Sequence, residues 1–320
     1  MNEIFKKISI YKKKGFAKSI IEFLFRKLLL DQVIKFILNT KFGRNSFYSK
    51  YPKNQLLIAN TSEGINYIVN SLDKVIGGET FVKRKSFDSQ KLIIAKSICG
   101  NKKSLILDVG ANIGTIGIFG ISQGLFKKCI SFEPDPHNFM LLQANVLING
   151  LNKKFELNNV ALSDKNINHL EFELSKDNFG DHRVKVKEKN GLYNEESRQV
   201  IRVKTSTIDG FLNGYDLSEA FLSMDTQGYE GHVLSGAKNL IEACVPIMTE
   251  FWPYGLKRSN GIEMFYEVLS NSDYNVLIDL SLPEKKHKFS IDLLRKIELE
   301  LVGKDPRRST DFMIYKEEEA

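Results

Sequence analysis

Residues 105–117, LILDVGANIGTIG, decide the fold of this chain. An apolar run reaches Asp108, and glycines follow at positions 110, 114 and 117 in a second apolar stretch. This order is typical of a buried strand, a tight turn and a helix whose N-terminus lies close to a ligand. An acid beside the turn would repel a phosphate group, so Asp108 raises the question of which ligand is bound.

The chain alternates between strand-like and helix-like segments from about residue 85 onward. Strands are expected at 104–108, 129–133, 154–162, 169–174, 199–205, 220–225, 245–251, 274–280 and 311–316. Helices are expected at 114–124, 136–150, 206–212, 228–242, 261–270 and 289–300. Such alternation predicts an α/β fold, in which a mostly parallel sheet carries helices on both faces. Ligands of these folds bind beyond the carboxyl ends of the strands.

Carboxylates follow five of the expected strands: Asp108, Glu133, Asp164, Asp225 and Glu250. Acids also favour the N-termini of helices, which explains one or two of them. Asp108 and Glu133 fit that explanation poorly because each ends an apolar strand. The set therefore predicts a ligand with positive charge at this edge of the sheet.

The turn after the first of these strands distinguishes two nucleotide ligands. An NAD-binding turn reads G-x-G-x-x-G, but here Asn112 occupies the place of the second glycine. S-adenosylmethionine (SAM) carries an ammonium and a sulfonium cation and no phosphate, so nearby acids attract it. Glu133 is placed to accept both ribose hydroxyls, and Asp164 to accept from the adenine amino group. The charges favour SAM over NAD.

Six blocks follow one another along the chain: LDVGANIGTIG, SFEPDPHNFMLLQANVLING, NVALSD, VKTSTIDGFL, LSMDTQGYEGHVLSGA and PIMTEF. Together they resemble the FkbM-type methyltransferases, which are SAM-dependent class I enzymes, from about residue 73 to the last strand. The resemblance implies a Rossmann-like sheet of seven mostly parallel strands, of which the last is antiparallel. It also implies O-methylation of a hydroxyl, commonly on a sugar or a polyketide. Cofactor contacts are expected from Asp108, Gly110, Asn112, Gly114, Glu133, Pro134, Ala161, Ser163, Asp164 and Asp225.

The chain departs from the family pattern at one position. The family block after the fourth strand usually reads D-V-E-G-Y/F-E, whereas residues 225–230 read DTQGYE. Gln227 keeps the hydrogen-bonding shape of the usual carboxylate and loses its charge. A non-catalytic SAM- or nucleotide-binding module of the same fold is therefore one alternative to an enzyme. An NAD-dependent oxidoreductase is a more distant one.

Methyl transfer to a hydroxyl needs a group that takes the proton. Glu230 precedes Val233 and Leu234 by three and four residues, so it is expected on the apolar face of its helix. A carboxylate there is costly unless it is paired or functional. Asp225 and Glu230 are the leading candidates for a base or a metal ligand, and His182 is the second candidate for the base. A bond from Glu230 to a helix terminus, or an ion pair, is the alternative.

The acceptor is expected to contact Arg183, Gln227, Glu250 and Trp252. Arg183 belongs to a long polar loop, where substrate contacts are often found. Glu250 is followed closely by three aromatic residues, and rings beside an acid suit a carbohydrate, whose C–H faces pack on rings while its hydroxyls bond the acid. Ordinary core aromatics are the alternative.

No metal is part of the prediction. Asp225, Glu230 and Glu250 could converge as oxygen ligands of a divalent ion, but the sequence gives no geometry for them. The three cysteines lie far apart and form no CxxC pair, which suits a reducing compartment better than a zinc site or a disulfide framework.

Positive charge is concentrated at the N-terminus. Residues 1–53 hold 13 Lys and Arg against three acids, a net charge of +10 in a chain whose total is +7. A nucleic-acid-binding protein would more often distribute basic charge over its main domain, so no nucleic acid is expected as a partner. We expect a basic helical extension at 1–72 and the methyltransferase domain at 73–320.

Residues 18–40 place apolar side chains at roughly helical spacing, with Lys or Arg every few residues. No apolar run approaches the ~20 residues that span a bilayer, and no cleavage site of a signal peptide is recognisable. Through residues 1–40 the helix is expected to pack on the main domain, on a second copy, or on an anionic membrane surface. The leading hypothesis is a cytoplasmic SAM-dependent O-methyltransferase, alone or at the inner membrane face, that acts on a sugar of a cell-surface glycan or glycolipid precursor.

Overall fold

The computed structural model describes residues 40–50, 54–100, 102–187 and 191–318. The chain divides into two compact units, Met1–Pro52 and Lys53–Ala320. The described part of the first unit contains helix α2, Lys41–Lys50. The segment predicted to meet a membrane or a second copy, residues 1–40, lies outside the described residues except for Thr40. No described helix is long and apolar enough to cross a membrane.

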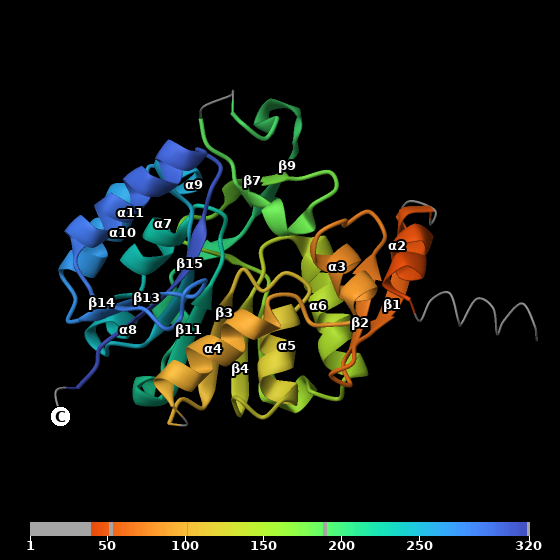
Figure 1. The fold of residues 1–320 in the computed structure, drawn as a ribbon, viewed down its shortest axis with the longest axis horizontal. Helices are drawn as coiled ribbons and strands as arrows, with labels where there is room; N and C mark the ends of the chain where they lie inside the picture. The colour runs from red at the N-terminus through yellow and green to blue at the C-terminus, as the bar shows by residue number, and fades with distance from the viewer. Residues whose placement is uncertain (1–39, 51–53, 101, 188–190, 319–320) are drawn as a thin grey trace, which may run out of the picture. The chain divides into compact units, whose positions relative to one another are not determined.

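A sheet of eight strands forms the centre of the second unit, in the order β14-β13-β15-β12-β11-β3-β4-β5 (Figure 1). The strands are β3 Leu105–Val109, β4 Lys128–Phe132, β5 Phe155–Asn158, β11 Ala220–Met224, β12 Ile247–Phe251, β13 Val276–Asp279, β14 Lys286–Lys288 and β15 Thr310–Tyr315. Strands β12, β11, β3, β4 and β5 are parallel, whereas β15 is antiparallel to both of its neighbours.

The expected α/β fold of the class I methyltransferases, a mostly parallel sheet with an antiparallel last strand, is confirmed. The prediction of seven strands missed the edge strand β14. Its sequence is Lys-His-Lys and all three residues are exposed, so it carries no apolar signal. It joins the sheet through its antiparallel pairing with β13 alone.

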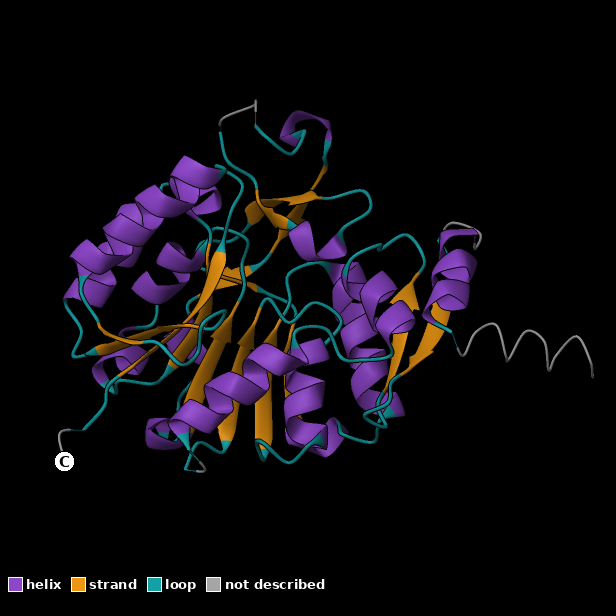
Figure 2. Cartoon of the chain, viewed as in Figure 1, coloured by secondary structure: helices purple, strands orange, loops and turns teal. Residues whose placement is uncertain are grey.

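Helices cover both faces of this sheet because side chains alternate along each strand. Leu105, Leu107 and Val109 of β3 pack in one core cluster with Val233 of α7 (Glu230–Ser235) and with Phe265 of α10 (Ile262–Ser270). The opposite face of β3 is covered by α5, Thr115–Ser122. The other helices are α3 Ile76–Lys83, α4 Ser89–Cys99, α6 Pro136–Ile148, α8 Lys238–Glu242, α9 Pro253–Arg258 and α11 Ile291–Lys304 (Figure 2).

A hairpin of β1 (Leu56–Asn60) and β2 (Asn66–Asn70) precedes the sheet. Side-chain amides of α6 and of Asn149, the residue after it, cover the edge of β2. The Ile68 N–H donates to Asn145 Oδ1 (2.6 Å) and the Asn66 N–H to Asn149 Oδ1 (3.0 Å). These bonds make the hairpin part of the second unit. The expected helical extension to residue 72 is therefore wrong over the hairpin, and the division lies near residue 52 instead.

Two expected elements are interrupted in the structure. The strand predicted at 154–162 is β5 followed by β6 (Ala161–Leu162), and β6 leaves the sheet to pair with β10 (Thr205–Ser206). The helix predicted at 228–242 is split into α7 and α8 at Gly236. A side chain at Gly236 would place its Cβ 2.2 Å from the Ser163 carbonyl oxygen, so close backbone packing breaks the helix there.

A small antiparallel sheet lies beyond the carboxyl ends of the central strands (Figures 1 and 2). It consists of β7 (Leu170–Leu174), β8 (Arg183–Val184) and β9 (Gln199–Val203), in the order β8-β7-β9. Strand β8 falls within a segment that reads as a polar loop, because its buried residue is an arginine.

Candidate active site

The turn after β3 brings two strand ends into contact. Gly110 has φ +82°, and a Cβ on it would lie 1.8 Å from the carbonyl oxygen of Asp225. The Gly110 N–H donates to the Phe132 carbonyl oxygen at 3.0 Å. Asn112 is also left-handed, at φ 51°, and its side-chain Nδ2 donates to the Phe179 carbonyl oxygen at 2.9 Å. The turn therefore requires a glycine at position 110 and fixes the ends of β3, β4 and β11 next to one another.

A cavity opens at these strand ends, and we name it the strand-end cavity. The structure brings seven of the predicted residues together in its wall: Gly110, Asn112, Glu133, Pro134, Ala161, His182 and Asp225. Apolar side chains supply much of the rest, including Phe132, Val160, Leu162, Phe172 and Phe179. An apolar slot with a few polar groups at one end suits a nucleoside ligand.

Four residues predicted to contact the cofactor are absent from this wall. Asp108 is buried on the α5 side of β3, where Oδ2 accepts from the Gly117 N–H at 3.1 Å. Gly114 packs against α6, since its Cβ would lie 2.6 Å from Leu142 Cδ1. Ser163 donates to Asp164 Oδ1 at 2.9 Å, and neither lines the cavity. For Asp108, the bond to the first turn of a helix is the alternative explanation of a strand-end acid.

Glu133 is one of two acids in the wall of the strand-end cavity, and the other is Asp225. Its two carboxylate oxygens each accept one backbone N–H, from Asn112 and from Asp135, both at 2.8 Å. Burial raises the pKa of Glu133 to about 8, although these two bonds oppose the shift. Each oxygen keeps a further lone pair, so Glu133 can accept two hydroxyl groups from a ligand.

His182 cannot take a proton in this arrangement. The Ser175 N–H donates to its Nδ1 at 3.0 Å, which leaves the ring hydrogen on Nε2. Burial, together with the nearby charge of Arg198, lowers the pKa of His182 to about 3. Nδ1 accepts a hydrogen bond and Nε2 already carries the ring hydrogen, so the prediction of His182 as a base is wrong for this geometry.

Arg183 is occupied by an internal ion-pair network. Its guanidinium lies 3.0 Å from Glu173 and 3.3 Å from Glu195, and its side chain is only 6% exposed. The same group lies over the rings of Tyr193 and Trp252, at 5.2 and 5.1 Å from their centroids. Arg183 therefore supports those rings from behind, and the predicted direct contact with the acceptor is not available to it.

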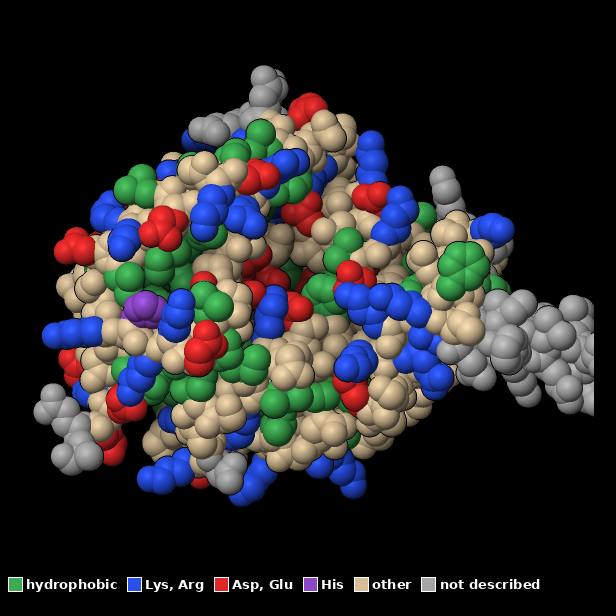
Figure 3. Space-filling model, viewed as in Figure 1, with side chains coloured by type: hydrophobic (Ala, Val, Ile, Leu, Met, Phe, Trp, Pro, Cys, Tyr) green, Lys and Arg blue, Asp and Glu red, His purple; other side chains and the backbone are tan. Residues whose placement is uncertain are grey.

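A second cavity lies beside the first, and we name it the polar cavity. Its volume is about 420 Å³ and it is lined by Ser175, Asp177, Asn178, Asp181, Leu192, Tyr193, Asn194, Arg198, Gln227, Glu250, Trp252, Arg307 and Ser309. Three of the four predicted acceptor residues thus come together here. Figure 3 shows acidic side chains at the bottom of a hollow on the face in view. Sequence reasoning missed Tyr193, Arg198 and Arg307, which lie outside the motif blocks and show no pattern of their own.

The turn after β11 separates the two cavities. Gln227 Nε2 donates both to Asp225 Oδ1 (2.6 Å) in the strand-end cavity and to Glu250 Oε2 (3.1 Å) in the polar cavity. Gln227 is left-handed, at φ 55°. The next residue, Gly228, packs so closely on α9 that a Cβ would lie 2.3 Å from the Gly255 carbonyl carbon. A left-handed residue whose backbone is held in place by close packing, as at Gln227 and Gly228, is characteristic of functional sites.

Glu230 holds this turn from behind. It is fully buried, and its Oε1 accepts from the Thr226 N–H (2.8 Å), the Thr226 hydroxyl (2.9 Å) and the Gly228 N–H (3.3 Å). It is absent from the walls of both cavities. The expected inward orientation is confirmed, and the bonds to a turn beside a helix terminus correspond to the alternative reading of this residue.

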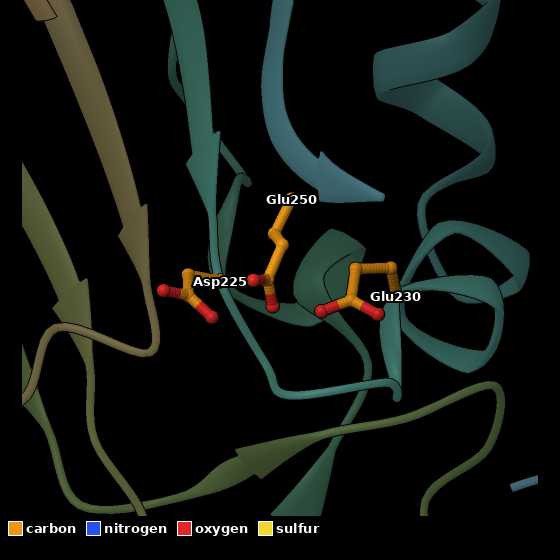
Figure 4. A group of neighbouring side chains, drawn as sticks. All are labelled: Asp225, Glu230 and Glu250. Atoms are coloured by element: carbon orange, nitrogen blue, oxygen red, sulfur yellow. The ribbon is translucent and has the colours of Figure 1, made fainter. Parts of the chain in front are cut away.

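Asp225, Glu230 and Glu250 lie together at the junction of the cavities (Figure 4). One oxygen of each lies within 4.8 Å of the others. Asp225 is exposed to solvent at the bottom of the cavity, whereas Glu230 is buried. Loss of water around the carboxylates at the strand ends, and then repulsion within the group, raises the pKa of Asp225 and of Glu250, although the Asp225 side chain keeps access to solvent. The group has the donor atoms that a hard divalent cation takes.

The raised pKa values of Asp108 and Glu133 predict how stability depends on pH. Burial raises them to about 7 and about 8, from ordinary values of 3.8 and 4.5. Between these limits the folded chain binds more protons than the unfolded chain, so stability falls as pH rises. We expect the melting temperature of the ligand-free protein, followed by circular dichroism, to fall from pH 5 to pH 8.5. Glu133→Gln should flatten that slope, and an equal slope in the variant would contradict the assignment.

Comparison with known proteins places this chain among methyltransferases. The model of the methyltransferase FkbM domain matches residues 108–294. No curated protein is detectably similar to the chain. Among solved structures, the methyltransferase FkbM from Methylobacillus flagellatus KT is 18% identical with a TM-score of 0.39, over 67% of this chain and 44% of that one. The chain therefore spans less than half the length of that protein.

Two further structures are similar at lower identity. TYW2 from P. horikoshii, in complex with MeSAdo, is 14% identical with a TM-score of 0.35, over 83% of this chain and 74% of that one. The tRNA m1G37 methyltransferase of M. jannaschii is 12% identical with a TM-score of 0.38, over 82% of this chain and 54% of that one. Because the domain model matches more than half of the 320 residues, the chain belongs to the FkbM methyltransferase family.

Proposed function

We propose that the protein binds SAM in the strand-end cavity and transfers its methyl group to a sugar hydroxyl held in the polar cavity. The acceptor would be a glycan or a glycolipid precursor. One observation carries the proposal: Gln227 bonds at once to Asp225 in one wall and to Glu250 in the other. A donor and an acceptor bound on either side of that turn would meet at Asp225.

The chemistry of the strand-end cavity supports SAM over NAD. Glu133 offers two carboxylate oxygens for the ribose hydroxyls, and Asp225 adds a second acid to the same wall. Both would attract the cationic methionine end of SAM and repel a pyrophosphate. The apolar side chains of the wall would enclose the adenine ring.

The polar cavity supports a hydroxylated acceptor. Tyr193 and Trp252 lie edge to face with ring centroids 5.4 Å apart, so they offer ring surface to the C–H face of a sugar. Asp181, Arg198 and Glu250 in the same wall offer acceptors and donors for its hydroxyls. Charges of both signs around two rings suit a neutral polyhydroxylated ring better than an apolar acceptor.

Asp225 is the group that we assign to the acceptor's proton. His182 accepts a hydrogen bond on Nδ1 and carries its ring hydrogen on Nε2, and Glu230 lies behind the turn. Asp225 lies in the cavity wall and is exposed to solvent there. Its raised pKa keeps the carboxylate basic enough to take a proton near neutral pH.

Calorimetry with SAM, S-adenosylhomocysteine (SAH) and NAD tests the cofactor, and transfer of label from radioactive SAM to glycan extracts tests the reaction. We expect SAM and SAH to bind and NAD not to bind. Absence of binding by both SAM and SAH would refute the proposal. Binding of SAH without transfer to any glycan fraction would favour the non-catalytic module instead.

The cofactor site makes a sharper prediction for two acids. Glu133→Gln should weaken SAH binding about 10- to 100-fold, because a hydrogen bond to a charged group contributes roughly 1.5–3 kcal/mol. Asp164→Asn should change the affinity less than about threefold, because Asp164 is absent from the cavity wall. Calorimetric titration of both variants measures the difference. The reverse order would place the ligand beside Asp164 and contradict the assigned cavity.

A further inference from the structure

The acids at the junction of the two cavities have no basic partner. Three carboxylates, from the ends of β11 and β12 and the start of α7, lie side by side in Figure 4, and one oxygen of each lies within 4.8 Å of the others. Among the described residues, no Lys or Arg forms an ion pair with Asp225, Glu230 or Glu250. The nearby Asp311 differs in this respect, since Lys91 Nζ lies 2.7 Å from its carboxylate.

Glu230 supplies a second observation that points to a ligand. Its side chain is fully buried, and Oε2 has no hydrogen-bond partner in the described part of the chain. Oε1, by contrast, accepts three bonds. A buried carboxylate oxygen left unpaired costs roughly 1–3 kcal/mol or more, so the arrangement calls for a partner that the protein itself does not provide. In Figure 4 this carboxylate faces Glu250.

We propose that Asp225, Glu230 and Glu250 bind a hard divalent cation, Mg²⁺, Mn²⁺ or Ca²⁺, at the junction of the strand-end and polar cavities. The set contains oxygen donors alone, which these ions prefer over nitrogen and sulfur. The donor oxygens lie within 4.8 Å of one another. Two oxygens on opposite sides of one ion lie about 4.2 Å apart for Mg²⁺ and about 4.6–5.2 Å apart for Ca²⁺. A separation of up to 4.8 Å therefore fits ligands around Ca²⁺, and the ligands would have to move slightly closer around Mg²⁺.

Gln227 would become a fourth ligand. Its Nε2 now contacts Asp225 and Glu250, and a half-turn of the terminal amide would place Oε1 there instead. The substitution of a carboxylate by Gln227 thus keeps a neutral oxygen donor. Asp225 and Glu250 line the two cavities, so a cation between them would touch an acceptor held in the polar cavity.

This inference rests on the proposed methyl transfer. In that reaction the cation activates the hydroxyl of the acceptor. The ion binds the acceptor oxygen and lowers the pKa of that hydroxyl. The proton passes to the Asp225 oxygen that does not hold the cation, and from there to solvent. The oxygen lone pair forms the new O–C bond as the C–S bond breaks, and sulfur keeps the electron pair to give SAH.

Binding of Mn²⁺ to the chelator-treated full chain, followed by electron paramagnetic resonance, tests the site without an acceptor. We expect one Mn²⁺ per chain with Kd below about 1 mM. Glu250→Gln and Glu230→Gln should each weaken binding at least about 10-fold. The matched control is Glu263→Gln, since Glu263 is a surface glutamate that pairs with Arg295, and it should bind Mn²⁺ as the native chain does. Absence of saturable binding, or equal binding by all the variants, would overturn the site.

The melting temperature, measured with and without Mn²⁺, distinguishes a role of Glu230 as a ligand of the cation from a purely structural role. In Glu230→Gln the amide oxygen can keep the three bonds of Oε1, while the NH₂ group replaces the unpaired oxygen and can donate to Glu250. We expect the metal-free variant to melt at the same temperature as the native chain or higher, and to lose the rise in melting temperature that Mn²⁺ gives the native chain. A metal-free variant that melts lower, with its Mn²⁺ response intact, would overturn the assignment.

Gln227→Glu offers a gain-of-binding variant. It adds a fourth carboxylate, so it should lower the melting temperature without metal and raise the affinity for Mn²⁺ about 10-fold or more. An unchanged or weaker affinity would contradict the placement of Gln227 in the site.

The cofactor measurement keeps the two proposals apart. SAH should bind equally with and without chelator, because Glu133 and the apolar wall hold it. If SAH binds and label transfers at full rate in the presence of chelator, the cation is refuted and the methyl transfer stands. If SAH never binds, the methyl transfer is refuted, and Mn²⁺ binding that fails in Glu250→Gln still supports the site.

Discussion

Asp225→Asn is expected to lower kcat for methyl transfer about 10²- to 10⁴-fold, the usual contribution of a positioned acid–base group. Asparagine keeps the size of the side chain and an oxygen that can accept from Gln227 Nε2, so the turn should hold its shape. It cannot take a proton from the acceptor. We therefore expect the affinity for SAH to change less than about threefold, and the loss to fall on the rate.

The pH profile distinguishes a role in chemistry from a role in folding. Native kcat should rise with pH as Asp225 loses its proton, and this rise should disappear in Asp225→Asn. Asp216→Asn is the matched control, because Asp216 is an exposed aspartate far from both cavity walls, and its kcat should equal that of the native chain. A native rate in Asp225→Asn would remove Asp225 from the mechanism.

Arg183→Met is expected to lower the free energy of unfolding by about 3–5 kcal/mol, the usual loss when one member of a buried ion pair is removed. Methionine fills much of the same space but leaves Glu173 and Glu195 buried without the guanidinium between them. Arg198 remains beside Glu173, at 3.8 Å, and limits the loss on that side. Urea unfolding followed by circular dichroism measures the change.

An exposed arginine provides the control for Arg183. Arg295 pairs with Glu263 at 2.8 Å, and their side chains are 49% and 70% exposed. Arg295→Met should therefore cost no more than about 1 kcal/mol. Equal losses in the two variants would contradict the buried network. Loss of Arg183 should also weaken binding of the acceptor, since the guanidinium supports the Tyr193 and Trp252 rings.

The sequence pattern predicted correctly the positions of some strand-end acids and not of others. Glu133 and Asp225 lie in the cavity wall as predicted, whereas Asp108 faces the opposite side of β3 and bonds to α5. Alternation along a strand fixes that successive side chains lie on opposite faces. It does not fix which residue beyond the strand end turns toward the ligand, because that depends on the neighbouring strand and helix.

His182 and Arg183 were predicted as functional because both belong to a long polar segment, and such loops often contact substrates. Both side chains are buried in the structure. Strand β8 adds Arg183 to a small sheet, where Glu173 and Glu195 pair with it, and His182, just before that strand, accepts from the Ser175 N–H. The partners Ser175, Glu173 and Glu195 lie up to 12 positions away with no regular spacing. Such pairings leave no periodic signal in a sequence.

The sequence alone determined the order of strands and helices, the glycine at the β3 turn and the family, because apolar periodicity and the steric demands of a left-handed turn are local properties. It also supplied Glu133, Asp225, Glu250 and Trp252 of the site, but not Tyr193. Only the tertiary structure decided that Gln227 lies between Asp225 and Glu250, and that Glu230 lies beside them with one oxygen that has no hydrogen-bond partner among the described residues. Those contacts join the end of β11 to the end of β12 and the start of α7, and their distances depend on how the strands and helices pack.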